Sequence, residues 1–269
     1  MTAAAKTSAS GQDGRNRAEA VVDLDAISGN VARIREHTVG RDVMAVVKAD
    51  GYGHGLVESA RAARAGGATW LGVALLDEAL QLRRAGDRGS LLSWLAVPGE
   101  AYTEAIDADV EVSAYADWQL AEIVGGAQRA GARARVQLKV DSGLGRGGAL
   151  PGDWQRLVDQ AAAAQSARHL DVTGVWSHLA RSDEPGHPSI AAQTATFDAA
   201  VAHANSAGLE PRHVHLANSG GALASPDTWF TMVRPGIAIY GVTPFPDGAS
   251  PVELIPAMTL RATVALAKR

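Results

Sequence analysis

Short apolar runs alternate with amphipathic segments from residue 42 to residue 233 of this 269-residue chain. Several runs are apolar at nearly every position, which is typical of strands covered on both faces. The alternation indicates βαβ units, and eight such strands favour a (β/α)8 TIM barrel over an open doubly wound sheet. The predicted strands are 42–47, 69–74, 91–97, 109–113, 134–140, 171–176, 213–216 and 229–233.

The segments between these strands have the apolar spacing of helices and end at glycines. Gly66, Gly86, Gly131 and Gly208 each follow such a segment, and glycine readily adopts the left-handed conformation that closes a helix. The helices predicted in this way cover residues 56–65, 75–85, 115–130 and 189–207.

Two pieces lie outside the predicted barrel. Residues 18–38 begin with a strand-like run and continue as a helix, for which we expect Asp25 to be the N-cap and Ile27, Val31 and Ile34 to share one face. Residues 249–257 have the composition of a linker, and residues 258–269 alternate like a strand with one wet face and no evident partner. We therefore expect a tail over 1–17, a barrel domain over 18–248, and the truncated start of a β-rich domain over 249–269.

Composition excludes several classes of protein. The absence of cysteine removes disulfides and thiolate nucleophiles, and a net charge of −4 gives no basic surface for nucleic acid. The chain lacks an apolar run of about 18 residues, so we expect no membrane span. The polar residues 1–17 lack the apolar stretch of a signal peptide, and we expect a disordered tail on a cytoplasmic protein.

Polar side chains cluster after the predicted strands. In a barrel, the carboxyl ends of the strands meet at one face, where active sites lie. This convergence favours an enzyme, and the residues in question are Lys48, Tyr52, Lys139, Arg146, His178, Asn218, Ser219, Arg234, Gly236 and Ile237.

Lys48 and Ser219 suggest a particular cofactor. A lysine directly after the buried run 44–47 is partly desolvated, which lowers its pKa and favours reaction with an aldehyde. Loops after the seventh and eighth strands often bind phosphate, and Ser219 and Gly236 offer a hydroxyl and amides there. Together they suggest pyridoxal phosphate. From position alone, a snorkelling lysine, a helix-capping Ser219, a structural His178 and ion-paired arginines stay open.

Two weaker patterns carry little weight. The glycines over 143–148 lack the spacing and the following acidic residue of a dinucleotide site. Asp141 and His178 have no further ligands at metal-site spacing, so we expect no metal.

Five segments resemble the alanine racemases, in the same order. AVVKADGYGHG at 45–55 resembles the pyridoxal-phosphate signature of that family, and KVDSGLGR at 139–146 resembles its substrate-side loop. The other matching segments are WSHLA at 176–180, HLANSGG at 215–221 and VRPGIAIYG at 233–241.

The resemblance implies a role for each site residue. Lys48 would carry the cofactor and act as one of two bases. Arg234 would face the pyridine nitrogen and be oriented by His178, and Asn218 would be a further cofactor-binding residue. Arg146 would bind the substrate carboxylate, and Lys139, carbamylated in some members, would position it. The phosphate would be held by Tyr52, Ser219, Gly236 and Ile237.

The resemblance also implies a two-base racemisation of L- and D-alanine that supplies peptidoglycan synthesis. The second base is a tyrosine from the β domain of the partner subunit in a homodimer, and none of Tyr52, Tyr102, Tyr115 and Tyr240 matches it. We therefore expect this chain alone to bind the cofactor weakly and to turn over poorly. The alternatives are a racemase or decarboxylase of another amino acid, a barrel-only cofactor-homeostasis protein, and a non-catalytic binding module.

Overall fold

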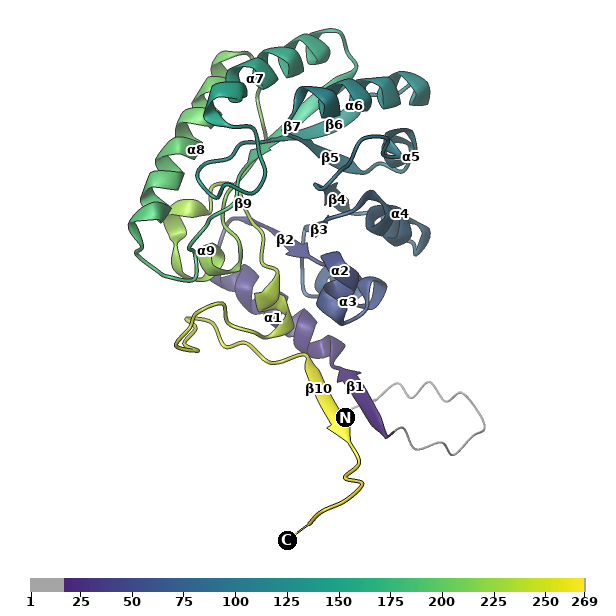
Figure 1. The fold of residues 1–269 in the computed structure, drawn as a ribbon, viewed down its shortest axis with the longest axis vertical. Helices are drawn as coiled ribbons and strands as arrows, with labels where there is room; N and C mark the ends of the chain where they lie inside the picture. Colours follow the sequence, from purple (N-terminus) through teal and green to yellow (C-terminus); the bar gives the residue numbers. More distant parts are fainter. Residues whose placement is uncertain (1–16, 269) are drawn as a thin grey trace.

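Eight parallel strands form a barrel in the computed structural model, which describes residues 17–268. The strands are hydrogen-bonded in the order β8-β7-β6-β5-β4-β3-β2-β9 (Figure 1). The barrel closes between the first and last strands of this order through two backbone hydrogen bonds, from Thr231 N–H to Val214 O at 3.0 Å and from Arg234 N–H to Ala217 O at 2.9 Å. The predicted TIM barrel is confirmed, with strands β2 Asp42–Val46, β3 Trp70–Val73, β4 Ser90–Ser93, β5 Glu111–Ala114, β6 Ala134–Lys139, β7 Leu170–Trp176, β8 His213–His215 and β9 Met232–Val233.

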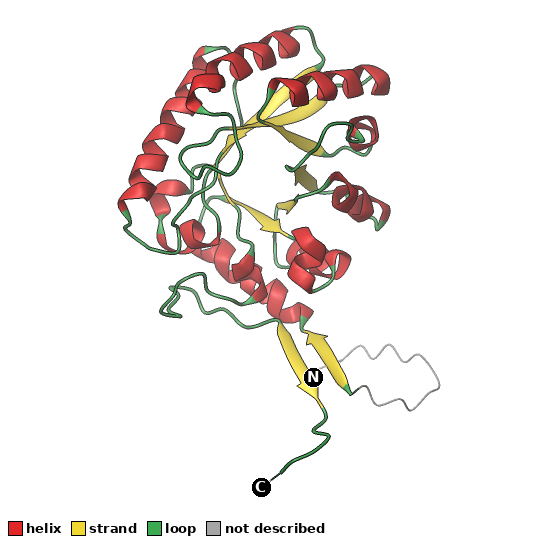
Figure 2. Cartoon of the chain, viewed as in Figure 1, coloured by secondary structure: helices red, strands yellow, loops and turns green. Residues whose placement is uncertain are grey.

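Helices surround the barrel (Figure 2). The predicted glycine stops are confirmed at Gly86, Gly131 and Gly208, which take positive φ angles of 97°, 63° and 82° at helix ends. Gly66 keeps a helical φ of −73°, and the positive φ of 94° falls on the next residue, Gly67. Two helices that the sequence analysis did not predict, α5 and α7, complete the ring. The helices are α1 Leu24–His37, α2 Lys48–Gly53, α3 Leu56–Ala65, α4 Leu76–Arg84, α5 Tyr102–Asp107, α6 Asp117–Ala130, α7 Pro151–Ser166, α8 Pro188–Ser206 and α9 Ser219–Ala224, with short 3-10 turns at η1 Pro226–Thr228 and η2 Ile237–Tyr240.

The N-cap of α1 is Asp23, and the prediction of Asp25 was wrong. The Asp23 carboxylate accepts a hydrogen bond from Ala26 N–H at 3.0 Å, which satisfies one of the free amides of the first turn. Asp25 lies inside that turn, where a negative charge still favours the helix dipole. Ile27, Val31 and Ile34 are fully buried on one face, as predicted.

The two ends of the described chain pair with each other. Strand β1 (Ala18–Val22) runs antiparallel to β10 (Met258–Ala262), with Ala18 opposite Ala262 and Val22 opposite Met258. The expectation of a partnerless strand over 258–269 was wrong, because its partner lies at the far end of the sequence, where no local pattern can reveal it. The two-stranded ribbon extends away from the barrel (Figure 1), and Leu260 is 79% exposed, so neither face of β10 is covered there.

The predicted tail over 1–17 lies, apart from Arg17, outside the described residues. Within residues 17–268, none of the helices combines the length and apolar character needed to cross a membrane.

Candidate active site

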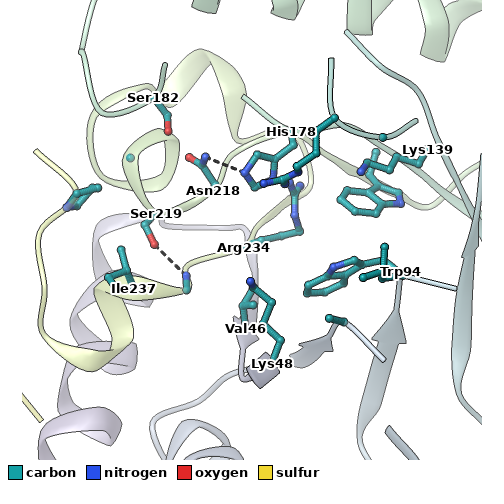
Figure 3. Close-up of a pocket in the computed structure, with 18 of the residues that line it drawn as sticks. Val46, Lys48, Trp94, Lys139, His178, Ser182, Asn218, Ser219, Arg234 and Ile237 are labelled. Atoms are coloured by element: carbon teal, nitrogen blue, oxygen red, sulfur yellow. Dashed lines mark hydrogen bonds between the residues drawn. The ribbon is translucent and has the colours of Figure 1, made fainter. Parts of the chain in front are cut away.

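A cavity of about 410 Å³ opens at the carboxyl ends of the strands, which we call the mouth of the barrel. Active sites of barrel enzymes occupy this position. Figure 3 shows the side chains of Lys48 and Arg234 near each other at the centre of the cavity lining, with Ser219 to one side and His178 beyond Arg234. The structure brings together at this cavity every residue that the sequence singled out: Lys48, Tyr52, Lys139, Arg146, His178, Asn218, Ser219, Arg234, Gly236 and Ile237.

A left-handed turn carries Lys48 and Tyr52 into the cavity. Residues 49–52 all have positive φ, with Ala49 at 52°, Asp50 at 53° and Tyr52 at 53°. A non-glycine residue in this conformation costs about 1–2 kcal/mol, so the turn needs support from its surroundings. The Asp50 carboxylate accepts from Leu56 N–H at 2.8 Å, and Glu78 accepts from Ala49 N–H at 2.6 Å.

Ser219 and the segment after β9 form a cradle of polar groups. Ser219 Oγ accepts from the amides of Gly236 at 2.9 Å and Ala238 at 3.3 Å. A Cβ atom at Gly236 would collide with the Tyr52 hydroxyl, so glycine is required for this close approach. The cradle therefore places Tyr52, Ser219, Gly236 and Ile237 together at one wall of the cavity.

Arg234 is buried and held in one orientation. Its Nη2 donates to Ser177 O at 2.7 Å and Leu216 O at 3.2 Å, and lies 3.4 Å from His178 Nδ1. Its guanidinium also lies over the Trp176 ring, 5.0 Å from the centroid. Burial and the charges of Arg234, Arg146, Lys139 and Lys48 hold the pKa of His178 well below its ordinary value, so this imidazole is neutral and can accept from an arginine.

Lys139 lies close to other cations. Burial, followed by the charges of Arg146 and Arg234, lowers the pKa of Lys139 to about 8. The charge of Asp141 offsets part of this lowering, while its carboxylate accepts from the amides of Gly143, Leu144 and Gly145 at 2.9–3.1 Å. Those bonds fix the loop that leads to Arg146.

The cavity is strongly positive. Its lining includes Lys48, Lys139, Arg146 and Arg234 but no aspartate or glutamate. Across residues 17–268, none of these four cations has a carboxylate partner within 4.0 Å. A concave site with unbalanced cations and perturbed pKa values is typical of a binding site for an anionic ligand.

Aromatic residues that the sequence analysis did not single out complete the cavity. Trp94 follows β4 directly, Trp176 ends β7, and Tyr115 follows β5. Trp176 supports two cations, because Lys139 Nζ lies 4.6 Å from its ring centroid on the same side chain that contacts Arg234. A survey of strand ends that included aromatic as well as polar residues would have found them.

The chain has the features of a barrel enzyme. Its eight parallel strands carry, at their carboxyl ends, a lysine, an anion cradle and a cation-rich cavity. Comparison with known proteins specifies the family. Residues 22–244 match the family model described as "Alanine racemase, N-terminal domain", and the chain belongs to this family.

Curated relatives support the same assignment. The alanine racemase of Thermobifida fusca is 52% identical over 252 residues, covering 94% of this chain and 67% of that protein. The alanine racemase of Streptomyces coelicolor is 51% identical over 260 residues, covering 94% of this chain and 66% of the relative. The chain thus spans about two thirds of the length of these relatives.

Solved structures share the architecture. Alanine racemase from Streptomyces lavendulae superposes with a TM-score of 0.91 at 48% identity, over 93% of this chain and 66% of that one. The Corynebacterium glutamicum enzyme gives a TM-score of 0.84 at 36% identity, over 93% and 70% of the two chains.

Proposed function

We propose that this chain forms the cofactor-binding barrel of a pyridoxal-phosphate-dependent alanine racemase, which interconverts L- and D-alanine. The observation that carries the proposal is the placement of Lys48 and the Ser219 cradle on one positively charged cavity. The named activity of the relatives supports the choice of reaction.

The residues present fit the coenzyme. A volume of about 410 Å³ lies within the range of cofactor pockets. The hydroxyls of Tyr52 and Ser219 and the amides of Gly236 and Ile237 would hold its phosphate. Lys48 would supply the amine that condenses with its aldehyde, and Arg234 would face its pyridine nitrogen.

The chain's own residues then divide the work of catalysis. When bound, the coenzyme withdraws electrons from the substrate α-carbon and so acidifies its hydrogen. Lys48 Nζ would move a proton on one face of that carbon. Arg234 only donates hydrogen bonds, so it would keep the pyridine nitrogen unprotonated and restrain electron withdrawal, which favours simple reprotonation over side reactions. His178 would orient Arg234 from beside Asn218.

Arg146 and Lys139 would serve the substrate carboxylate. Because the pKa of Lys139 is lowered to about 8, part of its amine is neutral near physiological pH and can react with carbon dioxide. That reaction forms an N–C bond, releases a proton, and replaces a cation with a carbamate anion. The anion would position Arg146 and reduce the excess positive charge of the cavity.

The opposite face of the α-carbon needs a second proton carrier, since one base cannot easily reach both faces. As the family resemblance implies, we assign this role to a tyrosine in the part of the relatives that this chain does not match, contributed across a homodimer. A supply of D-alanine for peptidoglycan is the physiological role we propose.

The test is titration of the chain with pyridoxal phosphate, followed by a racemisation assay with L-alanine in protein that also contains the remaining third of the relatives' length. We expect a visible absorption band that is absent in Lys48→Ala and retained in the control Lys268→Ala, which removes an exposed lysine. Loss of a catalytic base should lower racemisation by about 10²–10⁴-fold. A band of equal strength in Lys48→Ala would contradict the proposal.

The same assay separates the alternatives. Faster racemisation of serine or lysine than of alanine would indicate a racemase of another amino acid. A band without turnover of any amino acid, in protein that also contains the remaining third of the relatives' length, would favour a cofactor-homeostasis protein.

A further inference from the structure

A line of buried polar side chains crosses the interior of the barrel from the mouth to the opposite end, where the strands begin and which we call the floor. Starting from Arg234, Nη1 lies 3.1 Å from His215 Nδ1, and His215 Nε2 lies 2.6 Å from Gln137 Oε1. Gln137 Nε2 then donates to Glu111 Oε2 at 2.8 Å. We call these four residues the interior relay, and all are buried.

The charges at the two ends of the relay determine the direction of every hydrogen bond. A guanidinium has only donors, so Arg234 favours a His215 ring that accepts at Nδ1 and carries its proton on Nε2. A carboxylate has only acceptors, so Gln137 must turn its NH2 group to Glu111 and its oxygen to His215. The two constraints agree, and each residue of the relay meets its neighbour with matching polarity.

The floor end of the relay is held by further groups. Thr173 Oγ1 donates to Glu111 Oε2 at 2.6 Å, and Arg135 Nε lies 3.1 Å from Glu111 Oε1. A hydroxyl donor and a cation thus face Glu111, whose carboxylate is the acceptor at this end of the relay.

The barrel wall leaves room for the Gln137 amide. A Cβ atom at Gly174 would lie 2.7 Å from the backbone oxygen of His213 and 3.0 Å from both the Gln137 amide carbon and its oxygen, closer than ordinary contact. Glycine at this position of β7 lets the amide reach His215 without displacement. Side chains alternate between the two faces of a strand, so Gln137 shares the inward face of β6 with Lys139 and points into the barrel interior.

We propose that Gln137 and Glu111 are positioning residues that hold His215 in its Nε2–H form and thereby fix the orientation of Arg234 toward the ring of the bound coenzyme. This inference rests on the proposed function for the identity of the ligand at Arg234. The opposite tautomer would place an N–H of His215 against an N–H of Arg234 and would push the guanidinium away. Burial and the Arg234 charge also keep the pKa of His215 well below its ordinary value, which favours the neutral ring that the relay needs.

The decisive variants are Gln137→Leu and Gln137→Glu. Leucine removes the acceptor for His215 Nε2–H. The Gln137→Glu variant preserves the polarity, because two adjoining carboxyl groups share one proton: the new side chain, when protonated, would accept from His215 and donate to Glu111. Gln119→Leu is the matched control, since Gln119 is also fully buried but bonds only to Tyr115 N–H.

The first measurement is the tautomer of His215, read from ¹⁵N NMR of histidine-labelled protein without coenzyme. We expect the Nε2–H form in the wild type, Gln137→Glu and Gln119→Leu, and a substantial Nδ1–H fraction in Gln137→Leu. A merely structural glutamine would change stability but leave the tautomer unaltered. An unchanged tautomer in folded Gln137→Leu would overturn the proposal, and so would an Nδ1–H form in the wild type.

The second measurement is the dissociation constant and the absorption maximum of bound pyridoxal phosphate. We expect Gln137→Leu to weaken binding about tenfold and to shift the maximum, with recovery in Gln137→Glu. Equal affinity and an equal spectrum in Gln137→Leu would overturn the link to Arg234. If the wild type binds no coenzyme, the proposed function fails, and the His215 tautomer still decides the relay. If Gln137→Leu does not fold, a wild-type Nδ1–H form or loss of the Nε2–H form in Gln137→Glu overturns the proposal.

Discussion

At the floor of the barrel the arginines are paired, whereas at the mouth the cations are not. Arg83 Nη1 lies 2.9 Å from Asp87 Oδ2, Arg64 Nε lies 2.9 Å from Asp87 Oδ1, and Arg135 Nη1 lies 2.7 Å from Asp109 Oδ1. Among the residues that line the mouth, the positive charges face each other across a cavity without a carboxylate.

The paired arginines of the floor serve the stability of the fold, whereas the unpaired cations of the mouth serve ligand binding. A buried charge with its partners in place is tolerated, while one that waits for a ligand raises the free energy of the folded chain. The mouth keeps its charge unbalanced because an anionic ligand completes it. Changes at the floor should therefore affect mainly unfolding, and changes at the mouth should affect mainly binding.

The largest effect on stability is expected for Arg83→Met. Arg83 donates to the backbone oxygens of Ala108, Gly89 and Asp109 as well as to Asp87. Its loss leaves several buried acceptors unpaired and should lower the free energy of unfolding by about 3–5 kcal/mol in urea denaturation. Arg84→Met, on the exposed side of α4, is the control and should change it by less than about 0.5 kcal/mol. A loss below about 1 kcal/mol in Arg83→Met would break the comparison.

Ser219→Ala should weaken coenzyme binding by about tenfold. The hydroxyl both accepts from the Gly236 amide and faces the cavity, and one hydrogen bond to a charged group contributes about 1.5–3 kcal/mol. The dissociation constant from absorbance titration checks this, with exposed Ser206→Ala as the control. Unchanged affinity would remove Ser219 from the phosphate site.

The smallest expected effect is an increase in stability on loss of a cation from the mouth. Lys139→Met should raise the free energy of unfolding at pH 7 by about 1 kcal/mol, because charging a buried amine among cations is unfavourable, although a cation–π contact offsets part of this. The pKa of Lys139 is about 8 in the folded chain and 10.5 ordinarily. Between pH 8 and pH 10.5 this lysine is protonated more fully in the unfolded chain than in the folded chain. The contribution of this group to the free energy of unfolding of the wild type therefore rises with pH over this range.

Urea denaturation at several pH values tests the Lys139 prediction, with bicarbonate excluded. The advantage of Lys139→Met over the wild type should shrink from pH 8 to pH 10.5. A stability difference in favour of Lys139→Met that grows over this range, or a destabilised Lys139→Met at pH 7, would show that the charge of Lys139 does not destabilise the folded chain.

Much of the site could be predicted from sequence because it lies at strand ends. Lys48, His178 and Arg234 each follow an apolar run, and a barrel brings such positions together whatever its detailed packing. The left-handed turn over residues 49–52 could not be predicted, because Ala49 and Asp50 adopt it only under support from Glu78 and Leu56.

Contacts between distant strands were also beyond sequence reasoning. The β1–β10 pair joins opposite ends of the chain, and local periodicity carries no information about such partners. The interior relay left a partial signal, since Gln137 and His215 are polar residues within strands. Alternation would have placed them in the barrel interior, but only the structure shows which neighbours they meet.

The central claim is that Lys48, and not Lys139, carries the coenzyme. Both amines lie on the same cavity, and the lowered pKa of Lys139 makes it a credible competitor. Reduction of the pyridoxal-phosphate complex with borohydride, followed by peptide mapping by mass spectrometry, identifies the lysine that becomes labelled. We expect the label on Lys48; a label on Lys139, or on neither lysine, would rule out Lys48 as the coenzyme's attachment point.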